Sequence, residues 1–185
     1  MKKHIYTIML ILGCISFAQA QRMIPGQMGL EVNTGILSVE SPGNYYLNVG
    51  LSINRKNGNY QLWTLEYTHA YSNYKFLKIP IETYTAAGGY SLHLLGDTRK
   101  NIALNTAFTA VVGYETVNRG KNILYDGAKI LNKEGFIYGA GGRLSFETYL
   151  FDRITLLLQG RIKVLWETSL EQLRPSAGLG MKYNY

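Results

Sequence analysis

The feature that most constrains this chain is a strict two-residue alternation in its last eleven residues, 175–185. From Ala177 onward every second residue is apolar or aromatic, and the residues between them are small or polar. A period of two indicates an extended strand with one apolar and one polar face. A strand of roughly 9–11 residues can cross a bilayer at a tilt, and strands in hydrocarbon must close into a barrel to pair their backbone groups. The segment therefore predicts the closing strand of a membrane barrel. Its expected lipid-facing residues are Leu179, Met181, Tyr183 and Tyr185.

The same alternation recurs upstream. The expected strands are 29–37, 45–54, 60–70, 81–95, 102–117, 136–149 and 154–167. The Asn57-Gly58 pair is a typical signal for a tight hairpin. The connections after the second, fourth and sixth strands are the shorter ones, and a longer, tyrosine-rich loop is expected at 71–78. Short periplasmic turns and long extracellular loops are typical of outer-membrane barrels. The sequence thus predicts an all-β fold, an eight-stranded antiparallel up-and-down transmembrane β-barrel of the outer-membrane type, over residues 29–185.

The first twenty residues have the pattern of a signal peptide. Two lysines precede an apolar run from Ile5 to Phe17, and a small-x-small motif ends at Ala20. We expect cleavage between Ala20 and Gln21, leaving a short periplasmic tail over 21–28 and a chain destined for the outer membrane. In the alternative, Ile11 to Cys14 is a lipobox and Cys14 is acylated, although Leu12 is bulky where a small residue is preferred.

Composition narrows the possibilities further. Cys14 is the chain's only cysteine, so cleavage would leave a protein that disulfides cannot hold together. The formal net charge is +7, which could favour anionic headgroups, acidic partners or nucleic acid, but the basic residues form no single block. No run of eighteen apolar residues follows the signal peptide, which excludes a membrane helix.

If the apolar faces meet lipid, a set of charged residues must point toward the barrel axis. They are Glu31, Glu66, Glu115, Arg143, Glu147, Arg161, Lys163 and Lys182. Unpaired charges in a dry interior are costly, so we expect acids and bases to pair. An eight-stranded barrel is just wide enough for its own side chains to fill it. This predicts a plugged, non-conducting cylinder; a gated or ligand-binding lumen is the alternative, as is a soluble periplasmic barrel with its apolar face inside.

Catalysis has two candidate groupings. His69 lies near Ser72 in sequence and could meet Asp126 of the long loop in a Ser-His-Asp arrangement. His93 shares a strand and a face with Ser91. No spacing motif supports either, so we expect no catalytic, cofactor-binding or metal-ligating residues and no enzymatic activity.

Several segments together resemble the TraO proteins of Bacteroides-type conjugative transposons. They are Gln21-Arg22 with Pro25-Gly26-Gln27, and the stretches 58–63, 82–85, 113–118, 126–131, 135–147 and 174–178. The resemblance implies a component of a conjugative DNA transfer apparatus in the donor's outer membrane. It also implies other conjugation proteins as partners. From the barrel pattern we expect outer-membrane lipid and the barrel-assembly machinery as further partners, and no direct binding of nucleic acid. The alternatives are a stand-alone envelope-stabilising or adhesion barrel, or a lipid-modifying outer-membrane enzyme.

Overall fold

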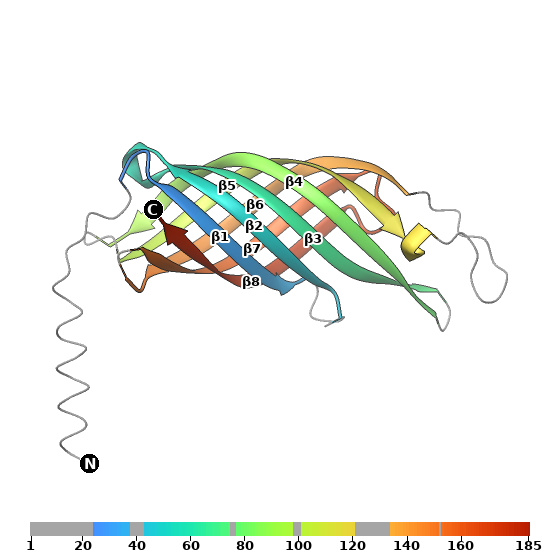
Figure 1. Ribbon diagram of the computed structural model, residues 1–185. Coiled ribbons are helices and arrows are strands. Elements are labelled where there is room, and N and C mark those ends of the chain that lie inside the picture. Colours follow the sequence, from blue (N-terminus) through green and yellow to red (C-terminus); the bar gives the residue numbers. More distant parts are fainter. Residues whose placement is uncertain (1–23, 38–42, 75–76, 98–100, 121–133, 152) are drawn as a thin grey trace, which may run out of the picture.

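The computed structural model describes residues 24–37, 43–74, 77–97, 101–120, 134–151 and 153–185. Its eight strands close into a single antiparallel barrel in sequence order (Figure 1). The strands are β1 (Met28–Ile36), β2 (Tyr45–Asn54), β3 (Tyr60–Tyr74), β4 (Leu77–Gly96), β5 (Ile102–Val117), β6 (Gly135–Tyr149), β7 (Ile154–Trp166) and β8 (Leu173–Asn184). Among the described residues, no helix has the length and apolarity to cross a membrane.

The first and last strands meet, which removes the free sheet edge. β1 pairs with β8 from Gly29 opposite Asn184 to Ile36 opposite Ala177. Beyond that ladder, Tyr185 donates its backbone N–H to the carbonyl of Met28 at 2.9 Å. The predicted closure and the eight-stranded antiparallel fold class are therefore confirmed.

Apolar side chains cover the outside of the barrel. Polar and charged side chains make up most of the inside, together with a smaller apolar cluster of Val111, Ile137 and Leu165. Leu65 and Leu179 are 68% and 63% exposed on the outer face, whereas Glu31 and Lys182, on the inner face, are 0% and 1% exposed. A water-soluble barrel would reverse this arrangement, so the alternation belongs to a barrel whose outer surface meets hydrocarbon.

The connection between β3 and β4 differs from the sequence-based expectation. A loop was expected at 71–78, but the ladder continues until Tyr74 pairs with Leu77. The ladder is made of backbone hydrogen bonds, which polar residues can continue. The end of the apolar–polar alternation therefore does not mark the end of the strands. β5 stops at Val117 opposite Ile81, which leaves Pro80 with a strand neighbour on one side only, where a ladder tolerates proline.

Smaller differences occur at other strand ends. β8 begins at Leu173 rather than at residue 175, and β1 begins at Met28. The turn before β1 is bound to the barrel, because Gly26 donates its N–H to the carbonyl of Asn54 at 2.8 Å. A register shift between His93 and Leu95 marks a bulge in β4. The signal peptide, its cleavage site at Ala20 and Gln21, and Cys14 lie outside the described residues.

Candidate functional site: the ionic interior

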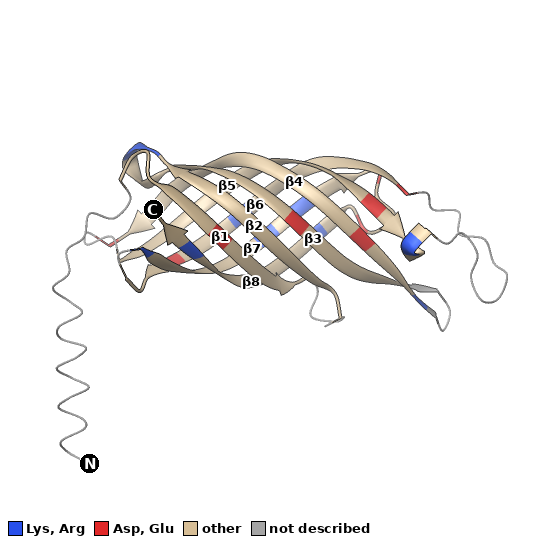
Figure 2. Cartoon of the chain, in the orientation of Figure 1, with Lys and Arg blue, Asp and Glu red and all other residues tan. Residues whose placement is uncertain are grey.

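The eight charged residues expected inside the barrel come from six strands, and all of their side chains point toward the axis. Figure 2 shows acidic and basic positions along the barrel wall. Seven of the eight are buried, and Lys163 is mostly so. Their charged groups form ion pairs that join strands across the lumen. These pairs are spread between the rim where β1 begins and β8 ends (the terminal rim) and the opposite rim (the loop rim).

Near the terminal rim, two ion pairs share one tyrosine. Lys182 Nζ lies 2.6 Å from Glu147 Oε2, and Arg143 Nη1 lies 2.8 Å from Glu31 Oε1. The hydroxyl of Tyr60 donates to Glu147 at 2.7 Å and accepts from Arg143 Nη2 at 2.9 Å. Tyr60 therefore connects the two pairs into one charge-assisted network across the barrel.

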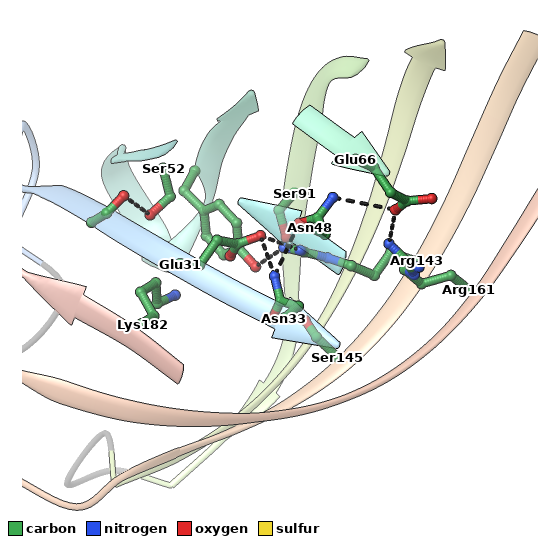
Figure 3. Close-up of polar contacts among 12 residues, drawn as sticks. Glu31, Asn33, Asn48, Ser52, Glu66, Ser91, Arg143, Ser145, Arg161 and Lys182 are labelled. Atoms are coloured by element: carbon green, nitrogen blue, oxygen red, sulfur yellow. Dashed lines mark hydrogen bonds and ion pairs between the residues drawn. The ribbon is translucent and has the colours of Figure 1, made fainter. Parts of the chain in front are cut away.

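Two asparagines extend this network toward the middle of the barrel (Figure 3). Asn33 donates to Glu31 at 3.2 Å and to Asn48 Oδ1 at 3.1 Å, and Asn48 in turn donates to Glu66 Oε2 at 3.3 Å. Glu66 pairs with Arg161 at 2.6 Å and with Lys163 at 2.7 Å. A single carboxylate at mid-barrel thus faces two cations.

A third cluster lies at the loop rim. Arg174 Nη2 lies 2.9 Å from Glu115 Oε2. The connection between β7 and β8 folds onto the same carboxylate, because Thr168 donates its hydroxyl at 2.9 Å and Ser169 its backbone N–H at 2.6 Å. Arg174 was not among the residues expected inside. The sequence does contain the signal for it, because Arg174 is an even number of residues from Lys182 and so shares its face of the strand. It was missed because the strand was expected to start one residue later.

Aromatic rings and glycines complete the filling. The guanidinium of Arg161 stacks on the ring of Tyr46, 3.6 Å from its centroid, a favourable cation–π contact. The hydroxyl of Tyr46 occupies the space that a Cβ at Gly178 would need, and the Asn33 amide does the same at Gly180. Two interior cavities lie beside Glu66, with volumes of about 30 Å³ and about 10 Å³. Each holds one or two water molecules at most.

The structure does not assemble the catalytic groupings weighed from the sequence. His69 lies on the outer face, where it packs 5.5 Å from the ring of Tyr45 and 4.8 Å from that of Tyr71. Ser72 is three residues further along the same strand and so belongs to the other face, while Asp126 lies outside the described residues.

The second histidine is bonded to an amide. His93 Nδ1 lies 2.9 Å from Asn105 Oδ1, whereas Ser91 donates to the carbonyl of Thr106 at 3.4 Å. Neither contact activates a serine nucleophile. Among the described residues, no three His, Cys, Asp or Glu side chains are grouped so as to hold a metal ion.

A closed eight-stranded cylinder with an apolar exterior and an ion-paired interior defines a class, the small outer-membrane β-barrels. Two solved structures of this class are similar in fold. Neisserial surface protein A has a TM-score of 0.53 at 13% identity, with 86% of this chain and 95% of that chain covered. The attachment invasion locus protein Ail of Yersinia pestis has a TM-score of 0.55 at 9% identity, with 88% and 100% covered.

The family follows from the sequence. The family model described as conjugative transposon protein TraO matches residues 24–185. The chain therefore belongs to the TraO family, as its segments suggested. No curated protein matches the chain.

Proposed function

We propose that this chain is an outer-membrane component of the conjugation apparatus of a conjugative transposon, acting as an anchor or accessory and not as the conduit for DNA. Membership of the TraO family supports a part in conjugative transfer. The apolar exterior of the closed barrel supports insertion in the outer membrane. The single observation that carries the distinction from a DNA conduit is the filled interior.

The interior leaves no room for a polymer to pass. Along the axis, Lys182, Glu147, Tyr60, Arg143 and Glu31 bond to one another across the lumen. The two interior cavities beside Glu66 have volumes of about 30 Å³ and about 10 Å³. A strand of DNA would have to displace several buried ion pairs, each of which is strongly destabilising to break.

Contacts with other transfer proteins would therefore involve the rims. At the loop rim β3 and β4 extend beyond their neighbours, since β2 pairs with β3 only as far as His69 and β4 with β5 only from Ile81. At the terminal rim, the turn at Ile24–Gln27 is bonded to the end of β2. In this proposal a signal peptide directs export, the barrel-assembly machinery inserts the chain, and the terminal rim faces the periplasm. The chain then acts by protein–protein contact, without catalysis or direct binding of nucleic acid.

The test deletes the gene in donor cells and measures transfer frequency and detergent sensitivity in the same strains. We expect transfer to fall and to recover when the intact chain is supplied in trans, with little change in detergent sensitivity. Unchanged transfer would contradict the proposal. A change in detergent sensitivity or surface adhesion in cells that lack the transposon would instead favour a stand-alone envelope protein.

Location is tested separately by membrane fractionation and by gel mobility with and without heating. We expect the chain in the outer-membrane fraction, with a folded band that shifts on boiling. Recovery in the soluble periplasm would overturn the membrane assignment and leave family membership intact.

A further inference from the structure

The charges inside the barrel do not balance at mid-height. Three of the four interior carboxylates each form an ion pair with one cation, and these pairs are Glu31–Arg143, Glu147–Lys182 and Glu115–Arg174. Glu66 pairs with both Arg161 and Lys163. Within the part of the chain that the structure describes, the interior therefore carries one surplus positive charge, located at Glu66.

Glu66 has no capacity left to satisfy this surplus. Its Oε2 accepts from Arg161 and Asn48, and its Oε1 accepts from Lys163 and Thr68. The Nε atoms of Arg143 and Arg161 find no acceptor among the described residues, although these side chains are only 7% and 8% exposed. Buried guanidinium N–H groups without acceptors are costly, as is a buried charge without a counter-charge.

The cavity of about 30 Å³ lies beside these groups. Its lining includes Arg143, Arg161 and Lys163, with Asn48 and Thr64 supplying further hydrogen-bond donors. Its only carboxylate, among the described residues, is the fully engaged Glu66. The size admits one or two water-sized groups, and the lining is rich in cations and donors.

We propose that this cavity binds one small monovalent anion, of the size of chloride, which neutralises the surplus charge. A water molecule could accept from the unpartnered Nε groups but would leave the charge uncompensated. A bulky anion such as gluconate is too large for the cavity. The bound anion would join β6 and β7 to the middle of the network and stabilise the folded barrel.

The test measures urea unfolding of the refolded chain in detergent micelles, in sodium chloride and in sodium gluconate at equal ionic strength, with tryptophan fluorescence and gel mobility as readouts. A ligand that binds only the folded state shifts the equilibrium by the factor one plus the ratio of its concentration to its Kd. Above the Kd, each tenfold rise in chloride should thus raise the folded-to-unfolded ratio about tenfold. Crystals soaked in sodium bromide should show an anomalous peak between Arg143, Arg161 and Lys163.

Lys163→Met is the informative variant, because it removes the surplus charge and leaves Glu66 paired with Arg161. The chloride dependence and the bromide peak should both disappear. Lys78→Met, which removes an exposed lysine on β4, is the matched control and should retain both. If Lys163→Met does not fold, Lys163→Gln serves in its place. Equal stability in chloride and gluconate, no bromide peak, or a dependence that survives the loss of Lys163 would each overturn the proposal.

Discussion

The pair formed by Glu147 and Lys182 gives the sharpest test of the ionic interior. Both side chains are almost completely buried, and their charged atoms lie 2.6 Å apart. Among the described residues, Lys182→Met would leave the Glu147 carboxylate with only two hydrogen-bond donors, the hydroxyls of Tyr60, at 2.7 Å, and Ser145, at 3.3 Å. Removing one partner of a buried ion pair costs about 3–5 kcal/mol. The folded-to-unfolded ratio should therefore fall by roughly two to three and a half powers of ten.

The companion variant Glu147→Gln leaves the buried lysine without its counter-charge instead. The ring of Tyr60, whose centre lies 4.6 Å from Lys182 Nζ, would still contact the ammonium group. The double variant has no unpaired charge at this site, so it should be more stable than the sum of the two single losses predicts. We expect a coupling energy of about 1–3 kcal/mol between the two sites. Lys56→Met makes the same chemical change on an exposed turn and should alter stability by less than about 0.5 kcal/mol.

The assay is reversible urea unfolding in phospholipid vesicles, followed by the fluorescence of Trp63 and Trp166 and by gel mobility. Two results would refute the reasoning. One is a Lys182→Met loss no larger than that of Lys56→Met. The other is strict additivity in the double variant, which would mean that the carboxylate and the ammonium do not interact.

Three further outcomes follow from the same geometry. Gly178→Ala should impair barrel closure, because its Cβ would collide with the Tyr46 hydroxyl. Gly160→Ala should fold normally, because a Cβ there meets nothing within 4 Å. The folded fraction of each variant, measured by gel mobility, tests this difference. Leu158→Lys places a charge on the lipid face and should destabilise the barrel by about 2–4 kcal/mol in vesicles, whereas a neutral effect would contradict that orientation. The purified chain in planar bilayers should give no stable openings of porin size, and such openings would refute the plug.

Much of the barrel follows from the sequence because two rules act at every strand position. Side chains alternate between the faces, and hydrocarbon accepts only apolar ones. The inward position of a residue such as Arg143 can therefore be read from its apolar neighbours alone. The alternation is weaker at strand ends beyond the hydrocarbon, where both faces meet water. That is why the continuation of β3 to Tyr74 and the inward Arg174 at the start of β8 were missed.

Partner choice inside the lumen could not be read in this way. Alternation places Glu66 on the inner face but does not say that Arg161 and Lys163, more than ninety residues later, share it. Those pairings depend on the tilt of the strands and on the register that closes β1 on β8. The linking role of Tyr60, at the very start of β3, needs the same three-dimensional information.

The interior network also explains why this barrel adopts one register. A one-residue slip of a strand moves its whole inner face outward. For β8, such a slip would turn Lys182 and Arg174 away from the axis, with Lys182 in hydrocarbon, and would leave Glu147 and Glu115 unpaired inside. A slip of β6 would turn Arg143 outward and away from Glu31, and a slip of β7 would turn Arg161 and Lys163 outward and away from Glu66. Buried ion pairs add little stability over a well-packed apolar core, but here they make alternative registers far less stable than the native one. A filled, charged interior is thus what allows eight strands, several with glycines on their inner faces, to close in a single arrangement, and that same filling is what supports a role other than the DNA conduit.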